Sequence, residues 1–265
     1  MQRRILIIDD HDDLATALEE VFSHVGHEVK VVEKRTEALG IEDIGAFDLV
    51  ITDLDVDGSA IEKNCALCPQ EMPPVDVGEH IKAFKLSAAN FRRNNFEESE
   101  LKDLVATVLD YKIRFVDKKD VVQGLRESIE FELPSAISLM HIVLEYLMKR
   151  VEKLGVCKPE QSNLFVALDE AFVNAVKHGN KFDLGKLIRV AAEVSRAEAR
   201  FTIEDQGEGF DVNEIPDPLD PENLFKTSGR GVLFIYNIMD EVKYNERGNR
   251  LTMVKKALLD EGQES

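Results

Sequence analysis

The sequence predicts two α/β domains in one chain: a doubly wound parallel sheet in the first half and an α/β sandwich in the second half. Its 265 residues exceed the usual size of a domain with one core. Near the start, short β-branched runs that end in aspartates flank an amphipathic helical pattern, which is typical of a parallel sheet. In the second half, two long helical patterns and several alternating strand patterns favour helices packed on one face of an antiparallel-rich sheet.

The composition limits the partners and the compartment. The 33 basic and 51 acidic side chains give a net charge of −18, so we expect no binding to nucleic acid or to an anionic membrane surface. No apolar run approaches the length of a membrane span. The three cysteines are an odd number, which argues against a disulfide framework. We therefore expect a cytoplasmic protein.

The first half predicts a βαβ unit with acidic residues at one edge. "RRILIIDD" and "FDLVITDLD" have the pattern of buried strands, and between them a helical pattern that ends in a glycine is followed by the strand "HEVKVV". Because ligands collect beyond the carboxyl ends of parallel strands, Asp9, Asp10 and Asp53 are expected side by side there. Three carboxylates attract a divalent cation, and oxygen ligands suit Mg²⁺. The alternative is that these acids only cap a helix, a role that Asp12 or Asp13 could also fill.

Together with "AFKLSAANFRRNNFEESEL", these stretches make residues 1–110 resemble a response-regulator receiver domain in shortened form. The resemblance implies a flavodoxin-like fold, Mg²⁺ held by the three acids, and Asp53 as the acceptor of a phosphoryl group in a phosphorelay from an upstream histidine kinase. The family carries a lysine before the last helix, where this sequence has Asn94 and Asn95. Phosphorylation of Asp53 is therefore left open.

The second half begins after a predicted linker at residues 111–126, which has mixed charge and no clear period. "ESIEFEL" then alternates like a half-buried strand. Apolar residues at helical spacing predict helices over residues 135–154 and 159–178. The chain closes with two alternating runs around Gly248 and Asn249, which predict a hairpin that completes the sheet.

Three polar residues lie four positions apart on the second of these helices. Glu170, Asn174 and His178 follow a stripe that drifts by about 80° over its length, because successive helical residues turn by about 100°. A solvent-exposed polar face is the usual meaning of such a triplet. The alternative is a set of ligands and a base, and the motifs that follow in the chain favour it.

Two glycine-containing loops have features suited to a nucleotide. "EARFTIED" ends at Asp205 and continues into Gly207 and Gly209, where the main chain can pass close to a ligand. A carboxylate at that point accepts a hydrogen bond from the amine of adenine and rejects the carbonyl of guanine. Further along, residues 229–231 ("GRG") directly precede an apolar helix, whose free N–H groups favour a phosphate.

The motifs "DEAFVNAVKHGN", "DQGEGFD" and "DPENLFKTSGRGVLFIYNIMDEVKY" occur in this order, and they make the predicted domain at residues 127–265 resemble the gyrase/histidine kinase-like ATPase superfamily, most closely the anti-sigma-factor serine kinases. By that resemblance Asn174 binds Mg²⁺ together with the phosphates of ATP, Glu170 orients or deprotonates the attacking hydroxyl, and Asp205 reads adenine. The other expected contacts to ATP are those that shape the base pocket or hold phosphates: Gly207, Gly209, Gly229, Arg230 and Gly231. Residues 213–228 would form a lid. For His178, a structural role at the helix end and a contact to nucleotide both stay open.

Three functions follow as hypotheses. The resemblance implies an ATP-dependent serine/threonine kinase that phosphorylates an anti-anti-sigma (STAS) protein, binds a sigma factor as an alternative client, pairs as a homodimer and is switched by the receiver. The second is a nucleotide-gated protein that sequesters a partner without phosphoryl transfer, against which the presence of both Glu170 and Asn174 argues. The third is a histidine autokinase, for which His141 is the candidate acceptor; it lacks the residues that the family places after it, and we expect it to have a packing role.

Overall fold

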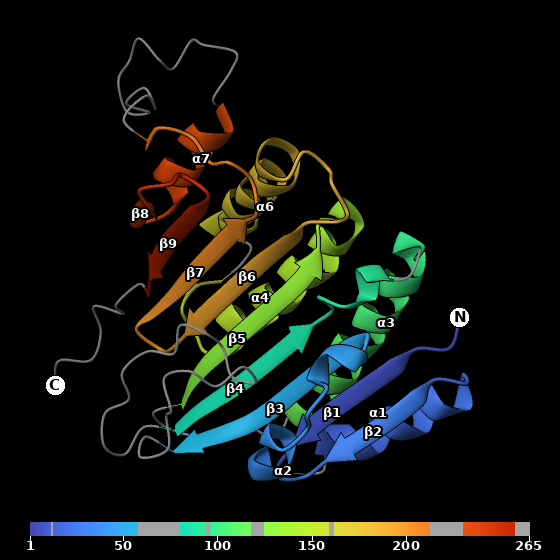
Figure 1. Cartoon of the computed structure of the whole chain (residues 1–265). Coiled ribbons are helices and arrows are strands. Elements are labelled where there is room, and N and C mark those ends of the chain that lie inside the picture. Colours follow the sequence, from blue (N-terminus) through green and yellow to red (C-terminus); the bar gives the residue numbers. More distant parts are fainter. Residues whose placement is uncertain are drawn as a thin grey trace, which may run out of the picture.

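The computed structural model describes residues 1–11, 13–57, 80–93, 96–117, 125–158, 162–212 and 230–257. Within these ranges, nine strands form one mixed sheet in the order β2-β1-β3-β4-β5-β6-β7-β9-β8 (Figure 1). The strands are β1 (Arg4–Asp9), β2 (Glu28–Val32), β3 (Leu49–Asp57), β4 (His80–Ser87), β5 (Leu125–Pro134), β6 (Leu187–Val194), β7 (Glu198–Asp205), β8 (Glu241–Tyr244) and β9 (Arg250–Lys256). The helices are α1 (Asp13–His24), α2 (Arg35–Leu39), α3 (Glu98–Tyr111), α4 (Met140–Lys153), α6 (Leu164–Asn174) and α7 (Arg230–Ile238).

The first three strands have the predicted parallel arrangement. β1 pairs with β2 on one side and with β3 on the other, both in parallel, and α1 connects β1 to β2. Both faces of β1 are buried, because Ile5 and Ile7 pack with α1 while Leu6 and Ile8 pack against Ala38 of α2. A strand covered on both faces needs a continuous apolar run, and the sequence of β1 provides one. The predicted βαβ unit is confirmed.

The next strand differs from a doubly wound sheet. β4 runs antiparallel to β3 and parallel to β5, whereas a flavodoxin-like receiver domain has all its strands parallel. Its sequence, "HIKAFKLS", alternates apolar and polar residues, and that alternation specifies which face is buried but not the direction of the strand. The doubly wound prediction therefore has to be corrected at β4.

The sheet continues across the predicted boundary between the halves. β4, α3 and β5 form a parallel strand–helix–strand unit, and β5 begins at Leu125, inside the predicted linker. The first residues of that linker extend α3 by a π-helical turn, Lys112–Val116. Across the β4–β5 pair, Lys85 Nζ lies 2.9 Å from Glu130 Oε1, and both side chains are buried. The described elements thus join the two halves, which we call the N-terminal half (residues 1–117) and the C-terminal half (residues 125–257).

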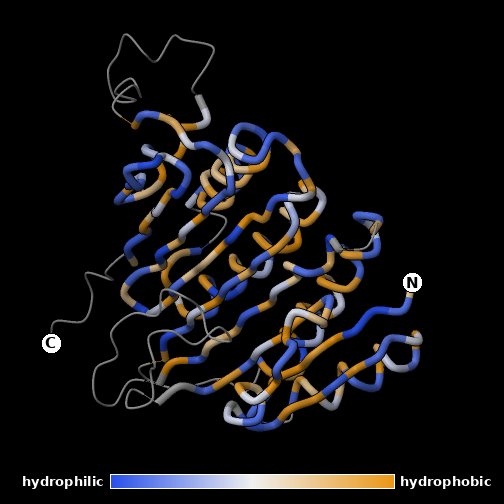
Figure 2. The backbone as a smooth tube through the Cα atoms, viewed as in Figure 1, coloured by the Kyte–Doolittle hydropathy of each residue, from blue (hydrophilic) through white to orange (hydrophobic). Residues whose placement is uncertain are grey.

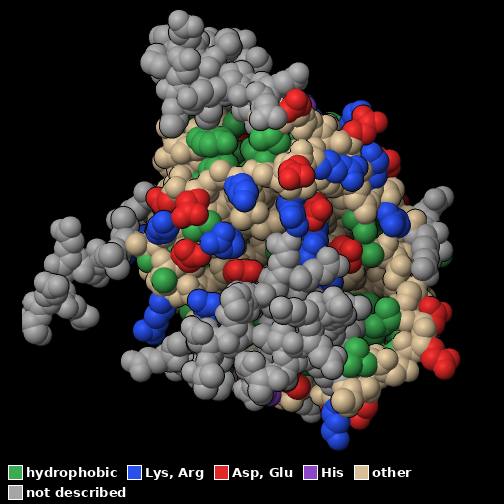
Figure 3. All heavy atoms as spheres, turned by 60° about the vertical axis from the view of Figure 1, so that its left-hand side comes forward, with side chains coloured by type: hydrophobic (Ala, Val, Ile, Leu, Met, Phe, Trp, Pro, Cys, Tyr) green, Lys and Arg blue, Asp and Glu red, His purple; other side chains and the backbone are tan. Residues whose placement is uncertain are grey.

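The core of the C-terminal half lies between the sheet and α4 and α6, as predicted. β6 and β7 alternate buried and partly buried residues, with Val190 and Phe201 on the face toward the helices. Figure 2 shows hydrophobic residues along the strands and on the helices packed against them. No helix in the described part of the chain is long and apolar enough to cross a membrane. On the face drawn in Figure 3, acidic and basic side chains are interspersed rather than separated by sign.

Candidate functional site

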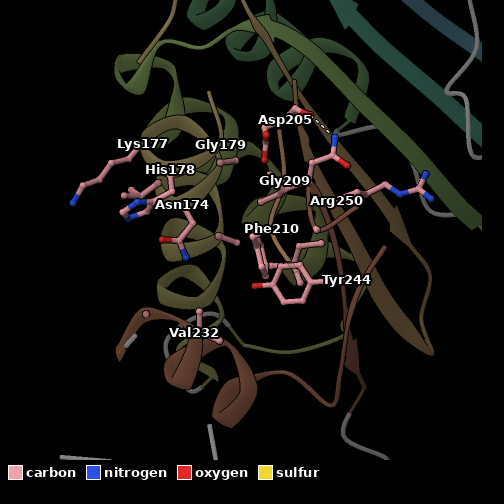
Figure 4. A pocket seen from close by; sticks show the side chains of 18 of the residues that line it. Asn174, Lys177, His178, Gly179, Asp205, Gly209, Phe210, Val232, Tyr244 and Arg250 are labelled. Atoms are coloured by element: carbon pink, nitrogen blue, oxygen red, sulfur yellow. Dashed lines mark hydrogen bonds between the residues drawn. The ribbon is translucent and has the colours of Figure 1, made fainter. Parts of the chain in front are cut away.

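A cavity of about 690 Å³ opens between α6, α7, the end of β7 and the β8–β9 hairpin (Figure 4). Several of the residues that the sequence singled out line it, among them Glu170, Asn174, His178, Asp205 and Gly209. Gly231, from the start of α7, lines it as well. These residues come from segments up to 61 positions apart, from Glu170 to Gly231, so the fold brings the three predicted motifs to one place.

The wall of the cavity formed by α6 ends in an unusual turn. After Asn174 the helix widens into a π-helical turn, Ala175–Gly179. Such turns are rare, and they are frequently found at functional sites. The wider turn places His178 and Gly179 on the cavity together with Asn174. Glu170, Asn174 and His178 all line the cavity, where the first two are half-buried and His178 is exposed, so the stripe forms part of the cavity wall.

Asp205 lies in a cradle made by two glycines. A Cβ atom at Gly179 would collide with the Asp205 carboxylate, and a Cβ atom at Gly207 would collide with the carbonyl oxygen of Gly179. The N–H of Gly207 donates to Asp205 Oδ1 at 2.7 Å. Burial raises the pKa of Asp205, while the hydrogen bond from Gly207 works in the opposite direction. Gly207 therefore acts by holding the carboxylate, and it does not line the cavity itself.

The opposite end of the cavity is formed where α7 meets α6. A Cβ atom at Gly231 would collide with Glu170 Oε2 unless the end of that side chain moved, so the glycine lets the start of α7 and this carboxylate come close. Arg230 is the first residue of α7. Gly229 and the predicted lid at residues 213–228 lie outside the described residues.

The β8–β9 hairpin supplies residues that the sequence analysis did not connect with the site. The Asn249 amide donates to the carbonyl oxygen of Asp205 at 2.8 Å, and the N–H of Asp205 donates to the Asn249 carbonyl at 3.0 Å. Arg247 Nη2 donates to the carbonyl oxygen of Gly207 at 2.8 Å. The hairpin itself was predicted, but these contacts depend on the pairing of β7 with β9, which local sequence does not specify.

An aromatic pair was also missed. Phe210 and Tyr244 both line the cavity, and their ring centroids lie 5.3 Å apart in an edge-to-face arrangement. Phe210 is 45% exposed although it is a large apolar side chain. Burial raises the pKa of Tyr244 to about 12. In Figure 4 the two rings lie across the cavity from Asn174.

The acids of the N-terminal half that the sequence singled out form hydrogen bonds within the protein. Asp9 Oδ2 accepts hydrogen bonds from the N–H groups of Leu14 and Ala15 at 2.7 and 2.8 Å, so Asp9 caps α1. Asp10 Oδ2 accepts one from the N–H of Asp55 at 3.1 Å. Among the described residues, no three His, Cys, Asp or Glu side chains are grouped so that they could hold a metal ion. Mg²⁺ binding by Asp9, Asp10 and Asp53 stays a prediction.

Asp53 belongs to a buried chain of charges that joins the two halves. Lys112 Nζ donates to both carboxylate oxygens of Asp53, at 2.8 and 2.7 Å, and lies 3.5 Å from Asp117. Asp117 is 3.1 Å from Arg150 of α4, which also pairs with Glu127 of β5. Burial raises the pKa of Asp53 to about 6, although Lys112 opposes the rise. Asn94 and Asn95, where the receiver family has a lysine, lie outside the described residues, and the lysine on Asp53 comes from the π-helical turn after α3.

His141 is more exposed than the packing role predicts. Its side chain on α4 is 74% exposed, and its ring meets Phe165 edge-on with the centroids 5.8 Å apart. Its Nε2 lies 3.9 Å from Glu145 on the next turn of the same helix. His141 therefore covers the edge of Phe165 and lies outside the core.

Comparisons with known proteins agree with the geometry of the cavity. The family model described as "Histidine kinase-like ATPase domain" matches residues 133–255. The C-terminal half is similar to that ATPase domain. The serine-protein kinase RsbW of Staphylococcus epidermidis is 29% identical over 143 residues, which cover 51% of this chain and 89% of the relative. RsbW of Staphylococcus aureus (strain bovine RF122 / ET3-1) is 27% identical over 143 residues, and RsbW of strain JH9 is 26% identical over 142 residues. Both alignments also cover 51% of this chain and 89% of the relative. The family match spans every residue that lines the cavity.

Proposed function

We propose that this protein is an ATP-dependent protein serine/threonine kinase of the anti-sigma-factor type. The observation that carries the proposal is the convergence of Glu170, Asn174, Asp205 and Gly231 on one cavity. Each of them has the chemistry that the resemblance to this kinase group assigns to its position. The similarity to RsbW, named a serine-protein kinase, supports the same activity.

In this proposal the two ends of the cavity take different parts of ATP. Asp205, held by Gly207, accepts a hydrogen bond from the adenine amine. The start of α7, beginning at Arg230 and Gly231, offers its N–H groups to the phosphates. Glu170 accepts the proton of the client's serine hydroxyl as its oxygen forms a bond to the γ-phosphorus. The bond from the γ-phosphorus to ADP breaks in the same reaction.

The donor set of the cavity fits Mg²⁺ bound through the nucleotide. Mg²⁺ is usually held by one or two protein oxygens, with substrate phosphates and water as its other ligands. Asn174 can give one amide oxygen, and it lies on the same cavity as Gly231 at the proposed phosphate end. When bound, the ion would neutralise part of the negative charge of the phosphates. The chain's own contribution is the position of Asn174 one turn after Glu170.

Phosphoryl transfer can be tested directly. The purified chain is incubated with γ-labelled ATP, Mg²⁺ and, one at a time, the STAS proteins and sigma factors encoded in the same genome. We expect label on a serine or threonine of one STAS protein, identified by mass spectrometry, and a stable complex with one sigma factor. ATP that binds but is transferred to no partner would leave a nucleotide-gated sequestering protein, and label on His141 would indicate an autokinase.

We also infer that the N-terminal half controls this activity through the buried charges. Lys112 connects Asp53 to Asp117, and Arg150 carries the connection to α4. Helix α4 packs against α6, which bears Glu170 and Asn174. Phosphorylation of Asp53 by an upstream histidine kinase would break its pairing with Lys112 and act along this route.

Regulation by the N-terminal half is tested with the full chain. We expect Asp53→Asn, which removes the charge and keeps the shape, to change the rate of phosphoryl transfer several-fold, and phosphorylation of the wild type by a small phosphoramidate donor to change it too. Two results together would exclude this regulation: a folded Asp53→Asn variant that transfers phosphate at the wild-type rate, and a wild-type protein that takes up no phosphoryl group from the donor.

A further inference from the structure

A short turn of the N-terminal half contacts a loop at the cavity. Arg92 lies on the 3₁₀ turn Phe91–Arg93, which precedes α3, and its Nη1 donates to the carbonyl oxygen of Gly185. Gly185 belongs to residues 180–186, which join the π-helical turn after α6 to β6 and which we call the wall loop. Lys181, inside this loop, lines the cavity. The N-terminal half therefore reaches a loop that forms part of the cavity wall.

The backbone of Arg92 has a fixed position. The preceding residue, Phe91, is fully buried, and the guanidinium carbon of Arg3 lies 4.1 Å from the centre of its ring. Beyond the turn, Glu98 at the start of α3 accepts a hydrogen bond from Ser138 of the C-terminal half at 2.7 Å. A buried, close-packed base of this kind moves little. The side chain of Arg92 is exposed, so it bridges the two halves at their surface.

The wall loop has an unfavourable backbone conformation that needs support. Lys181 and Phe182 both have a φ angle of 58°, in the left-handed region that side chains disfavour. Such a conformation persists where the surrounding contacts hold it in place. The start of the loop is held by Asn180, which is buried. Its amide donates to the carbonyl oxygen of Leu187 at 2.9 Å, and its Oδ1 accepts the N–H of Gln206 at 2.9 Å.

The end of the wall loop is held at Gly185 from two directions. Asp183 Oδ1 accepts the N–H of Gly185 at 2.8 Å, which is a contact within the loop. The carbonyl oxygen of Gly185 accepts the hydrogen bond from Arg92. Both Asp183 and Arg92 are exposed, so neither contact is fixed by burial. Of the two, the contact to Arg92 makes the loop depend on the position of the N-terminal half.

We propose that Arg92 is a positioning residue through which the N-terminal half sets the affinity of the cavity for ATP. By holding Gly185, Arg92 stabilises the left-handed turn at Lys181 and keeps this part of the wall in its place at the cavity. A shift of the turn before α3 releases the wall loop and weakens nucleotide binding. The inference rests on the proposed function. It adds a contact between the halves at the cavity itself, separate from the buried charges around Lys112.

The test is a double-mutant cycle on the full chain. Arg92→Met removes the donor and keeps a long side chain, and Asp183→Ala removes the contact within the loop. We expect each to weaken the binding of ATP with Mg²⁺, measured by calorimetry, roughly threefold to tenfold, the scale of one hydrogen bond to a charged group. The double variant should lose less than the product of the two factors, because both contacts hold Gly185. Arg92→Lys, which keeps a charged donor, should recover most of the affinity.

Hydrogen exchange followed by mass spectrometry gives a second readout, which needs no nucleotide. The amides of the wall loop should exchange faster in Arg92→Met than in the wild type. Arg114→Met is the matched control, because Arg114 is an exposed arginine of the same half that pairs with Asp110 beside it at 2.9 Å. It should change neither the exchange of the loop nor the affinity for ATP.

Two results would overturn the role of Arg92 in a protein that binds ATP. The first is a wild-type affinity in Arg92→Met, and the second is an equal loss in Arg114→Met, which would make the effect one of net charge. A wild-type protein that binds no ATP would instead overturn the proposed function, and this inference with it.

Discussion

Glu170→Gln is expected to lower the rate of phosphoryl transfer by about 10²–10⁴-fold while ATP binds almost as before. The substitution keeps the size of the side chain and its place against Gly231, but an amide cannot accept the proton of the client hydroxyl. If Glu170 only shaped the cavity, the amide would serve as well as the carboxylate. The measurement is single-turnover transfer of label to the STAS client, with ATP affinity determined separately by calorimetry.

Asp169→Asn provides the control for Glu170→Gln. Asp169 is the preceding residue of α6 and carries the same charge, but it does not line the cavity. Its substitution should leave the transfer rate within about twofold of the wild type, since a surface charge change of this kind has small effects. A Glu170→Gln variant that transfers phosphate at the wild-type rate would show that another group accepts the proton, or that none is needed.

Lys112→Met is expected to destabilise the whole chain by about 3–5 kcal/mol, the usual cost of removing one partner from a buried ion pair. Lys112 is the cation that both Asp53 and Asp117 contact, and all three side chains are buried. Methionine fills similar volume, so the cost comes mainly from the Asp53 carboxylate, which loses its counter-charge while Asp117 keeps Arg150, and not from a cavity. The measurement is the free energy of unfolding from urea titration, followed by far-UV circular dichroism.

The loss of stability should depend on pH with a defined sign. The pKa of Asp53 is raised by burial to about 6, from an ordinary value of 3.8, and loss of Lys112 would raise it further. An acid whose folded-state pKa is raised favours the folded state when it is protonated, so the variant gains stability relative to the wild type as the pH falls from 8 toward about 5. Asp9 and Asp117 both raise the pKa of Asp53 and so act in the same direction.

Two further variants make this prediction decisive. Lys102→Met removes an exposed lysine from the same helix and should cost little. Combining Lys112→Met with Asp53→Asn should recover part of the lost stability, because the amide needs no counter-charge. Equal stability of Lys112→Met and the wild type at pH 8 would mean that the buried pair contributes nothing to the fold.

The sequence singled out residues that line one cavity, but it did not predict the direction of every strand in the N-terminal half. Glu170, Asn174 and Asp205 could be found because helical spacing and a strand end are local patterns. The direction of β4 could not be found, since alternation is the same in both directions. Lys112 was missed because it lies in a segment of mixed charge, 59 residues from Asp53 in sequence. The contacts of Arg247 and Asn249 arise only when distant strands pair.

The place of β4 in the sheet also decides which surfaces are left for assembly. The alignment with RsbW covers 89% of RsbW but only about half of this chain. RsbW therefore has little or no counterpart of the N-terminal half. In this chain β4 occupies the hydrogen-bonding side of β5, and the described sheet ends at β2 and β8. Both edges of β5 are therefore paired, and a second copy cannot extend the sheet at this strand. Among the described strands, a homodimer that extends the sheet would have to form through β2 or β8.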